Sequence, residues 1–239
     1  MIFNKAFLVF FLLHFGLGSV QAQDSEEDYE YTDEFVWGIN KNTRGGLIGG
    51  FILKKSIRMN ENQFQTFGLE LMNVKHPKET RISNPLNGNS FIWGKENYLY
   101  SIRLQYGREQ VIFKKASFQG LQIHAILAGG PTIGLLAPYY IQNSNGINEP
   151  FDPEKHVDFN SILGTGNILQ GIGESEIKFG LNFKPALSFE FGAFKSNVSG
   201  IELGFMFEGF TEEIVLVPND SNDQFFTSFF VTLFYGRRR

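Results

Sequence analysis

Apolar and polar residues alternate along most of the chain. Between residues 177 and 191 the odd positions are apolar, whereas the even positions are polar or small, as at Lys178 and Glu190. Alternate side chains of a β-strand point to opposite faces, so this segment has one apolar face and one polar face. Residues 199–212 and 95–110 repeat the pattern, and no segment has a sustained helical period with caps. The pattern predicts an all-β protein.

Eight segments with this alternation follow one another along the chain. They lie near residues 35–43, 46–58, 63–76, 95–110, 118–138, 176–193, 199–212 and 225–237. Tight turns at 59–62, 113–117 and 195–198 alternate with longer connections at 76–95, 138–175 and 213–224, although the first connection, near 43–45, is also short. Short turns at one end and long loops at the other are typical of outer-membrane barrels, whose strands need roughly 9–11 residues to cross a bilayer. The sequence therefore predicts an eight-stranded antiparallel transmembrane β-barrel over residues 35–239.

The two faces of the predicted strands favour a membrane barrel over a soluble fold. A soluble β-sandwich or lipid-binding barrel would bury the Phe and Leu faces in its core. The opposite faces carry Gly, Ser and Asn between charged residues, which suits the narrow, side-chain-filled lumen of a closed eight-stranded barrel. Lipid would then cover the apolar faces, with an aromatic girdle near the strand ends formed by Trp93, Tyr98, Tyr100, Tyr139, Tyr140 and Tyr235. The soluble lipid-binding barrel is kept as an alternative.

Residues 121–141 are long and apolar enough to raise the possibility of a transmembrane helix. Gly129, Gly130 and Pro131 interrupt this segment, and glycine and proline are the poorest helix formers. We therefore predict a long strand with a bend at Gly-Gly-Pro.

Composition narrows the classes of function. The chain of 239 residues contains 27 Phe and 26 Gly, and its charged fraction of 19% lies below the value of about 25% that is usual for soluble domains. The absence of cysteine excludes disulfides, thiolate metal sites and a lipid-modified N-terminal cysteine. A net charge of -4 provides no overall basic field for nucleic acid.

Residues 1–22 have the features of a cleaved signal peptide. Lys5 supplies a positive charge, residues 6–18 form an apolar core, and small residues precede a cut between Ala22 and Gln23. The core is too short for an ordinary membrane-spanning helix. Residues 23–34 are acidic and sparsely apolar, which predicts a short solvated leader. We therefore expect the barrel in the cell outer membrane, in contact with its lipid.

Charged residues at the polar positions of the predicted strands would point into the lumen. Buried charges have to be paired, so we expect a salt-bridge network that fills the barrel. A proton or solute path is the functional alternative, but the small diameter of an eight-stranded barrel favours a filled interior without a pore. The residues assigned to this structural network are Glu70, Arg103, Lys178, Lys184, Glu190, Glu202 and Glu208.

Two further groups of residues in the predicted loops could carry chemistry. The carboxylates and the histidine of residues 149–158 could ligate calcium, but they do not follow the spacing of the calcium-binding loop, so a solvated acidic loop is favoured. A lipid-modifying enzyme would need a histidine such as His76 or His156 near a serine or an acid at the outer rim, for example Ser83. The spacing specifies no such site. We predict no catalytic residue, no metal site and no cofactor, with the lipid-modifying enzyme as an alternative.

Four short stretches carry a family resemblance. They are Trp37-Gly38-Ile39-Asn40, Tyr106-Gly107-Arg108-Glu109, Ala128-Gly129-Gly130-Pro131 with Ala137-Pro138-Tyr139-Tyr140, and Phe234-Tyr235-Gly236-Arg237. In these stretches the chain resembles the PorT-like small outer-membrane β-barrels of gliding, type-IX-secreting Gram-negative bacteria. The resemblance implies a link to protein secretion across the outer membrane, and none of its motifs is catalytic. We therefore expect a non-enzymatic scaffold or accessory barrel that meets a protein partner through loops 77–95, 138–175 and 213–224.

Overall fold

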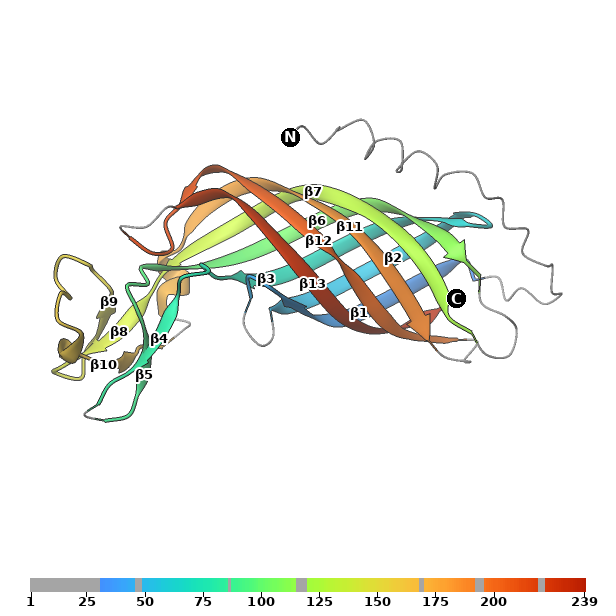
Figure 1. Cartoon of the computed structure of the whole chain (residues 1–239). Coiled ribbons are helices and arrows are strands. Elements are labelled where there is room, and N and C mark those ends of the chain that lie inside the picture. The colour runs from blue at the N-terminus through green and yellow to red at the C-terminus, as the bar shows by residue number, and fades with distance from the viewer. Residues whose placement is uncertain are drawn as a thin grey trace, which may run out of the picture.

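The chain forms a closed antiparallel barrel of eight strands. The structure, a computed structural model, describes residues 31–45, 49–85, 87–114, 120–167, 170–191, 196–218 and 222–239. The barrel strands are β1 (Asp33–Asn42), β2 (Gly50–Asn60), β3 (Gln63–Val74), β6 (Asn97–Phe113), β7 (Gln122–Pro138), β11 (Glu176–Phe191), β12 (Asn197–Ile214) and β13 (Asp223–Arg238). They follow one another around the ring in the order β1-β13-β12-β11-β7-β6-β3-β2 (Figure 1). The fold class predicted from the alternation is confirmed.

Pairing of the first strand with the last closes the ring. Strands β1 and β13 are in register from Glu34 opposite Arg238 to Asn42 opposite Phe230. The pairing continues beyond the strands, because the backbone amide of Thr32 donates to the carbonyl of Arg239 at 2.6 Å. Closure pairs both edges of every barrel strand. An unpaired strand edge would be costly in hydrocarbon, which offers no hydrogen bonds.

The barrel begins slightly earlier than the sequence predicts. Strand β1 starts at Asp33, and the side chain of Glu34 is 2% exposed rather than solvated. Glu34 was predicted to belong to the leader because it is acidic, but its carboxylate forms a buried ion pair with Arg238. The proposed cleavage site at Ala22 and Gln23 lies outside the described residues.

The Gly-Gly-Pro segment is part of one long strand, as predicted. Strand β7 is 17 residues long, and Pro131 lies on its outer face opposite Leu181 of β11. On the other side, the pairing with β6 is interrupted between Arg103–Thr132 and Tyr106–Gly129, where proline has no amide to donate. Within the described part of the chain, no helix has the length and hydropathy that a membrane crossing requires.

Two of the long connections fold into a body of their own beyond one end of the barrel (Figure 1). Strands β4 (Thr80–Ser83) and β5 (Ser90–Trp93) form a hairpin, and β8 (Tyr140–Asn143), β9 (Asn148–Pro150) and β10 (Ile162–Thr165) form a three-stranded sheet, with short 3₁₀ turns at Phe159–Ser161 and Gln170–Glu174. We call this part the loop body. Its apolar core consists of Phe91, Ile92, Tyr98, Ala137, Tyr139, Ile141, Phe151 and Ile162.

The loop body takes up the aromatic residues that were expected in a girdle. Tyr98, Tyr139 and Tyr140 are at most 8% exposed, and Trp93 and Tyr100 pack against the same core. Tyr139 accepts a hydrogen bond from the amide of Ile92 at 3.0 Å and thereby joins the sheet to the hairpin. The expected girdle is therefore wrong for these five residues, because the long loops bring their own surfaces to cover them.

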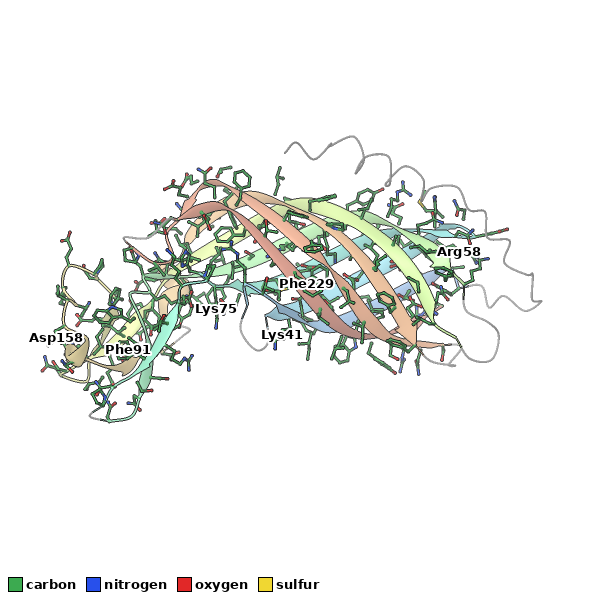
Figure 2. The ribbon with its side chains drawn as sticks, viewed as in Figure 1. Lys41, Arg58, Lys75, Phe91, Asp158 and Phe229 are labelled. Carbon is green, nitrogen blue, oxygen red and sulfur yellow. The ribbon has the colours of Figure 1, made fainter. Side chains whose placement is uncertain are left out.

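The barrel wall has the reverse polarity of a water-soluble protein. Phe229, for example, lies on its outer surface, whereas Phe91 belongs to the loop body (Figure 2). Large apolar residues on the outer face are exposed on every barrel strand: Phe35, Trp37, Ile39, Phe51, Phe67, Leu71, Leu104, Tyr106, Leu127, Phe179, Leu181, Phe183, Leu187, Phe205, Phe207, Phe225, Phe229, Leu233 and Tyr235. Many charged side chains of the strands, such as Glu70 and Arg103, are packed inside instead, while Lys55 and Arg108 lie on the outer face.

The pairing of β1 with β13, which we call the closing seam, brings the two backbones so close at Gly236 that a larger residue would not fit. A Cβ at Gly236 would overlap the carbonyl oxygen of Phe35 and lie 2.6 Å from Cγ1 of Val36. We expect Gly236→Ala to lower the free energy of unfolding by about 1–3 kcal/mol through overpacking, measured by urea titration in detergent. Gly173→Ala is the control, because a Cβ there meets no atom within 4 Å. Equal stability of the two variants would show that the seam has room to spare.

Candidate functional site

The candidate site is a network of charged side chains inside the barrel. Each barrel strand contributes at least one member, and all members have the inward parity of their strand. Their side chains are buried, with Arg238 the most exposed at 10%. The members are Glu34, Lys54, Glu70, Arg103, Glu109, His124, Lys184, Glu190, Glu202, Glu208 and Arg238.

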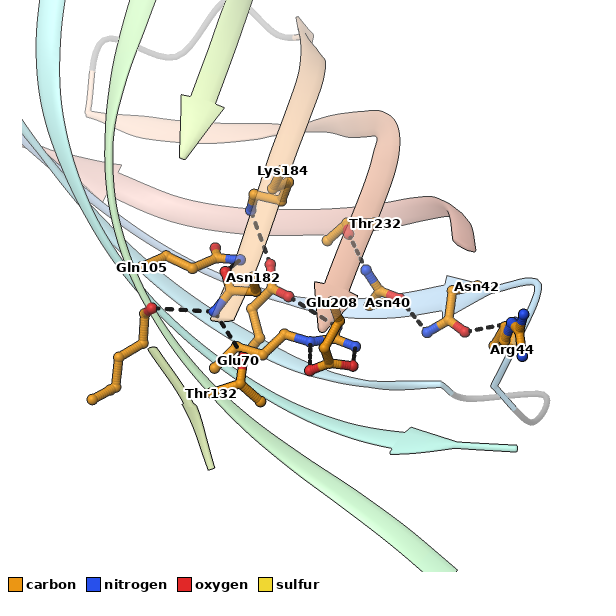
Figure 3. Close-up of polar contacts among 12 residues, drawn as sticks. Asn40, Asn42, Arg44, Glu70, Gln105, Thr132, Asn182, Lys184, Glu208 and Thr232 are labelled. Carbon is orange, nitrogen blue, oxygen red and sulfur yellow. Dashed lines mark hydrogen bonds and ion pairs between the residues drawn. The ribbon is translucent and has the colours of Figure 1, made fainter. Parts of the chain in front are cut away.

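The half of the network nearer the loop body centres on Arg103. Its guanidinium binds Glu208 in a bidentate manner, with Nε–Oε1 at 2.8 Å and Nη2–Oε2 at 2.9 Å, and Nη1 reaches Glu70 Oε2 at 3.4 Å. Lys184 Nζ lies 2.9 Å from Glu70 Oε1 (Figure 3) and 3.0 Å from Glu202 Oε1. Each cation thus joins two carboxylates from different strands, so the charges hold opposite walls of the barrel together.

Amide and hydroxyl groups fill the space beside these ion pairs. The Asn182 side chain donates to Thr132 Oγ1 at 3.0 Å and to the carbonyl of Gly130 at 3.0 Å, while its own carbonyl accepts from Gln105 at 3.2 Å (Figure 3). Asn40 donates to Thr232 Oγ1 at 3.0 Å, between directly paired residues of the neighbouring strands β1 and β13. Buried polar groups need such partners, since an unpaired one is costly in a site without water.

The second half of the network lies at the end of the barrel with the short turns, and Lys54 links it to the half around Arg103. Its ammonium lies 3.7 Å from Glu202 Oε2 and 3.2 Å from Glu109 Oε2. Glu109 Oε1 lies 2.5 Å from Nδ1 of His124, whose Nε2 is 3.5 Å from Glu190 Oε1.

Arg238 ends this chain of contacts. It pairs with the Oε2 atom of Glu190 and, through Nε at 2.6 Å, with Glu34. The guanidinium of Arg238 stacks over the ring of Tyr31, with its Cζ atom 4.1 Å from the ring centroid. Acids and bases therefore alternate from one end of the lumen to the other.

The network leaves little free space in the lumen. The internal cavity bounded by Lys54, Glu70, Gln105 and Lys184 has a volume of about 10 Å³, which is the room that one water molecule needs. At this level of the lumen the described side chains leave room for about one water molecule and none for a solute.

The structure brings six of the seven predicted lumen residues together. Lys178 is the exception, because it pairs with Glu176 and Glu212 near the start of β11, and the side chains of these acids are 70% and 65% exposed. Its parity is inward, but it lies beyond the enclosed part of the lumen. Sequence reasoning missed five members, namely Glu34, Lys54, Glu109, His124 and Arg238. Extending the same parity along each strand would have identified them.

The acidic segment 149–158 does not gather its carboxylates around a common point. Glu149 binds Lys155, accepts from Asn143 at 2.8 Å and lies 3.3 Å from His156 Nε2, and these hydrogen bonds lower the pKa of its carboxyl to about 2. Asp152 and Asp158 instead accept from backbone amides two residues further on. In the described residues the loop therefore uses its charges to hold its own fold.

His76, one of the two histidines considered for lipid chemistry, has contacts that hold a turn. His76 is 7% exposed, and its Nδ1 accepts a hydrogen bond from the backbone amide of Lys78 at 3.3 Å. Ser83 is an exposed residue of the β4 strand, paired with Ser90. The contacts of His76 serve the turn between β3 and β4.

The chain is similar in structure to several solved structures, including those of the proteins Ail and NspA. No family model matches the chain, and no curated protein sequence matches it. The attachment invasion locus protein Ail of Yersinia pestis, crystallised with the heparin analogue sucrose octasulfate, is 12% identical, with 88% of this chain and 99% of that chain covered and a TM-score of 0.40. Neisserial surface protein A (NspA) is 10% identical, with 87% and 97% covered and a TM-score of 0.38.

Two lysines on β11 test the energetic role of the network. Lys184→Met leaves Glu70 and Glu202 short of a buried cation, so we expect the free energy of unfolding to fall by about 3–5 kcal/mol. Lys178→Met is the matched control, because its acidic partners face water and its loss should cost less than about 1 kcal/mol. Urea titration of both variants in detergent measures the difference. Similar values would show that Lys184 is hydrated in the folded protein.

Proposed function

We propose that the protein is a non-enzymatic barrel of the outer membrane that acts as a scaffold or accessory protein through its loop body. The distribution of side chains carries this proposal. Apolar residues such as Phe179, Leu181 and Leu233 are 61–69% exposed on the outer wall, whereas the charged residues of the network are inside. A soluble protein exposes no apolar belt of this extent, and hydrocarbon provides the environment that such a wall requires.

The filled lumen supports a role without transport or ligand storage. The cavity of about 10 Å³ beside Lys54, Glu70 and Lys184 has no room for a lipid, which counts against the soluble lipid-binding alternative. The same packing counts against a constitutive channel. The surface left for specific contacts is the loop body, which a rigid barrel holds at one end.

The arrangement of the termini suggests an orientation. The first barrel strand begins at Asp33 and the chain ends at Arg239, both at the end of the barrel with the short turns, opposite the loop body (Figure 1). An exported chain that inserts from the periplasm would keep this end inside and expose the loop body to the outside. The resemblance to PorT-like barrels supports a further proposal, that the partner belongs to protein secretion.

Envelope fractionation tests the location. We expect the protein in the outer-membrane fraction, and we expect the unboiled protein to migrate differently from the boiled protein in a denaturing gel, because a closed ring of strands resists detergent. The folded protein reconstituted in planar bilayers should give no conductance steps. Recovery as soluble periplasmic protein without a gel shift would overturn the membrane assignment, and steady conductance would overturn the filled lumen.

Single cysteines test the orientation, since the natural chain has none. Ser144→Cys places a thiol at an exposed site in the β8–β9 turn, and Glu61→Cys places one at an exposed site in the β2–β3 turn. A membrane-impermeant maleimide should label the first in intact cells and the second only after the outer membrane is permeabilised. The reverse result would place the loop body in the periplasm.

A further inference from the structure

Three buried residues at the turn end of the lumen have the arrangement of a metal site. Glu109 of β6, His124 of β7 and Glu190 of β11 offer ligand atoms that all lie within 4.8 Å of one another. Strand β7 lies between the other two strands in the barrel, and the three side chains share its inward face. From this geometry we propose that the barrel binds one divalent transition-metal ion between these residues.

The two carboxylates are held in a way that leaves one oxygen of each for an ion. Lys54 Nζ and Ser56 Oγ both contact Oε2 of Glu109 at 3.2 Å, and Arg238 contacts Oε2 of Glu190. Oε1 of Glu109 lies 2.5 Å from Nδ1 of His124, and Oε1 of Glu190 lies 3.5 Å from Nε2 of the same ring. Outer groups that orient ligands in this manner are a regular feature of metal sites.

The ring of His124 has a nitrogen without a hydrogen bond. Its side chain is 1% exposed, yet Nδ1 has no hydrogen-bond partner among the described residues, although Glu109 Oε1 is close. The other nitrogen, Nε2, lies 2.7 Å from the side-chain amide of Gln122. The 2.5 Å contact between Nδ1 and Glu109 Oε1 lacks the geometry of a hydrogen bond, so an ion bound by both atoms would take its place. Buried polar atoms are nearly always satisfied, so this one points to a missing ligand.

A second buried atom beside the histidine is also unsatisfied. Ser188 is opposite His124 in the β7–β11 pairing, and its fully buried hydroxyl has no hydrogen-bond partner in the part of the chain that the structure describes.

The charge inside the barrel favours a dication. The network contains six carboxylates, Glu34, Glu70, Glu109, Glu190, Glu202 and Glu208, and four permanent cations, Lys54, Arg103, Lys184 and Arg238. These described groups leave an excess of two negative charges with a neutral imidazole, the form that binds metal, and of one with an imidazolium. A divalent ion would offset this excess, and buried charge requires compensation of this kind.

The donor set selects the class of metal. One imidazole nitrogen with two carboxylate oxygens suits Zn²⁺, Mn²⁺ or Fe²⁺, whereas Ca²⁺ and Mg²⁺ prefer oxygen ligands alone. The Phe64 ring stacks on His124 with centroids 6.3 Å apart, and Tyr31 stacks on Phe64 at 5.0 Å, so the site is covered at the turn end. An enclosed ion would tie three neighbouring strands together, which is a structural role.

Metal titration of the untagged mature protein, folded in detergent and stripped with a chelator, tests the proposal. We expect one Zn²⁺ per chain and a rise in unfolding temperature on its addition, with Co²⁺ giving the visible spectrum of a nitrogen- and oxygen-ligated ion. His124→Ala should abolish binding. His156→Ala is the control, because this histidine lies in the loop body and should leave the stoichiometry unchanged.

A milder variant covers the case in which His124→Ala does not fold. Ser56→Ala keeps the three ligands but removes a hydrogen bond that orients Glu109, so we expect Zn²⁺ binding to weaken by about tenfold. Absence of stoichiometric binding to protein that shows the folded gel band would overturn the proposal, as would Zn²⁺ affinity that neither His124→Ala nor Ser56→Ala changes. Both results would leave the outer-membrane location untouched, because the gel shift and fractionation report on it separately.

Discussion

The ring of hydrogen bonds that β13 completes by pairing with β1 is the constraint on which the rest of the structure depends. Once the sheet is closed, every strand has one face toward a narrow interior and one toward the surroundings. The side chains have sorted accordingly, with Phe and Leu outside and Glu, Lys and Arg inside. The lumen is too narrow for bulk water, so the inward charges have to neutralise one another across the barrel.

This requirement explains the pairing pattern of the lumen. Arg103 and Lys184 each bind two carboxylates, and Lys54 links the two halves of the network. The members come from all strands, so the full set of partners exists only after the barrel has closed. Buried pairs of this kind contribute little net stability compared with apolar packing, but breaking one is costly. They therefore favour one register of the strands over its neighbours, since a shift by one residue would turn the charges into the lipid.

The alternation of apolar and polar residues predicted some features of the structure and could not predict others. A period of two identifies a strand and the side on which a residue lies, and for this reason the eight strands and six lumen residues were found. It does not report the height of a residue along the barrel, and Lys178 was misplaced for that reason. The loop body was missed because its strands have only three or four residues and are held by contacts such as Tyr139 with Ile92, which are distant in sequence. Glu34 was misassigned because its partner, Arg238, stands at the other end of the chain.

The tips of the loop body have a practical consequence. Gly88 and Gly146 both adopt a positive φ, of 73° and 77°, at turns where an added Cβ would meet no atom within 4 Å. The segments around them are short, polar and remote from the barrel's ring of hydrogen bonds. Foreign peptides inserted at these two tips would extend into open space, and the closed barrel would serve as a rigid carrier that presents them.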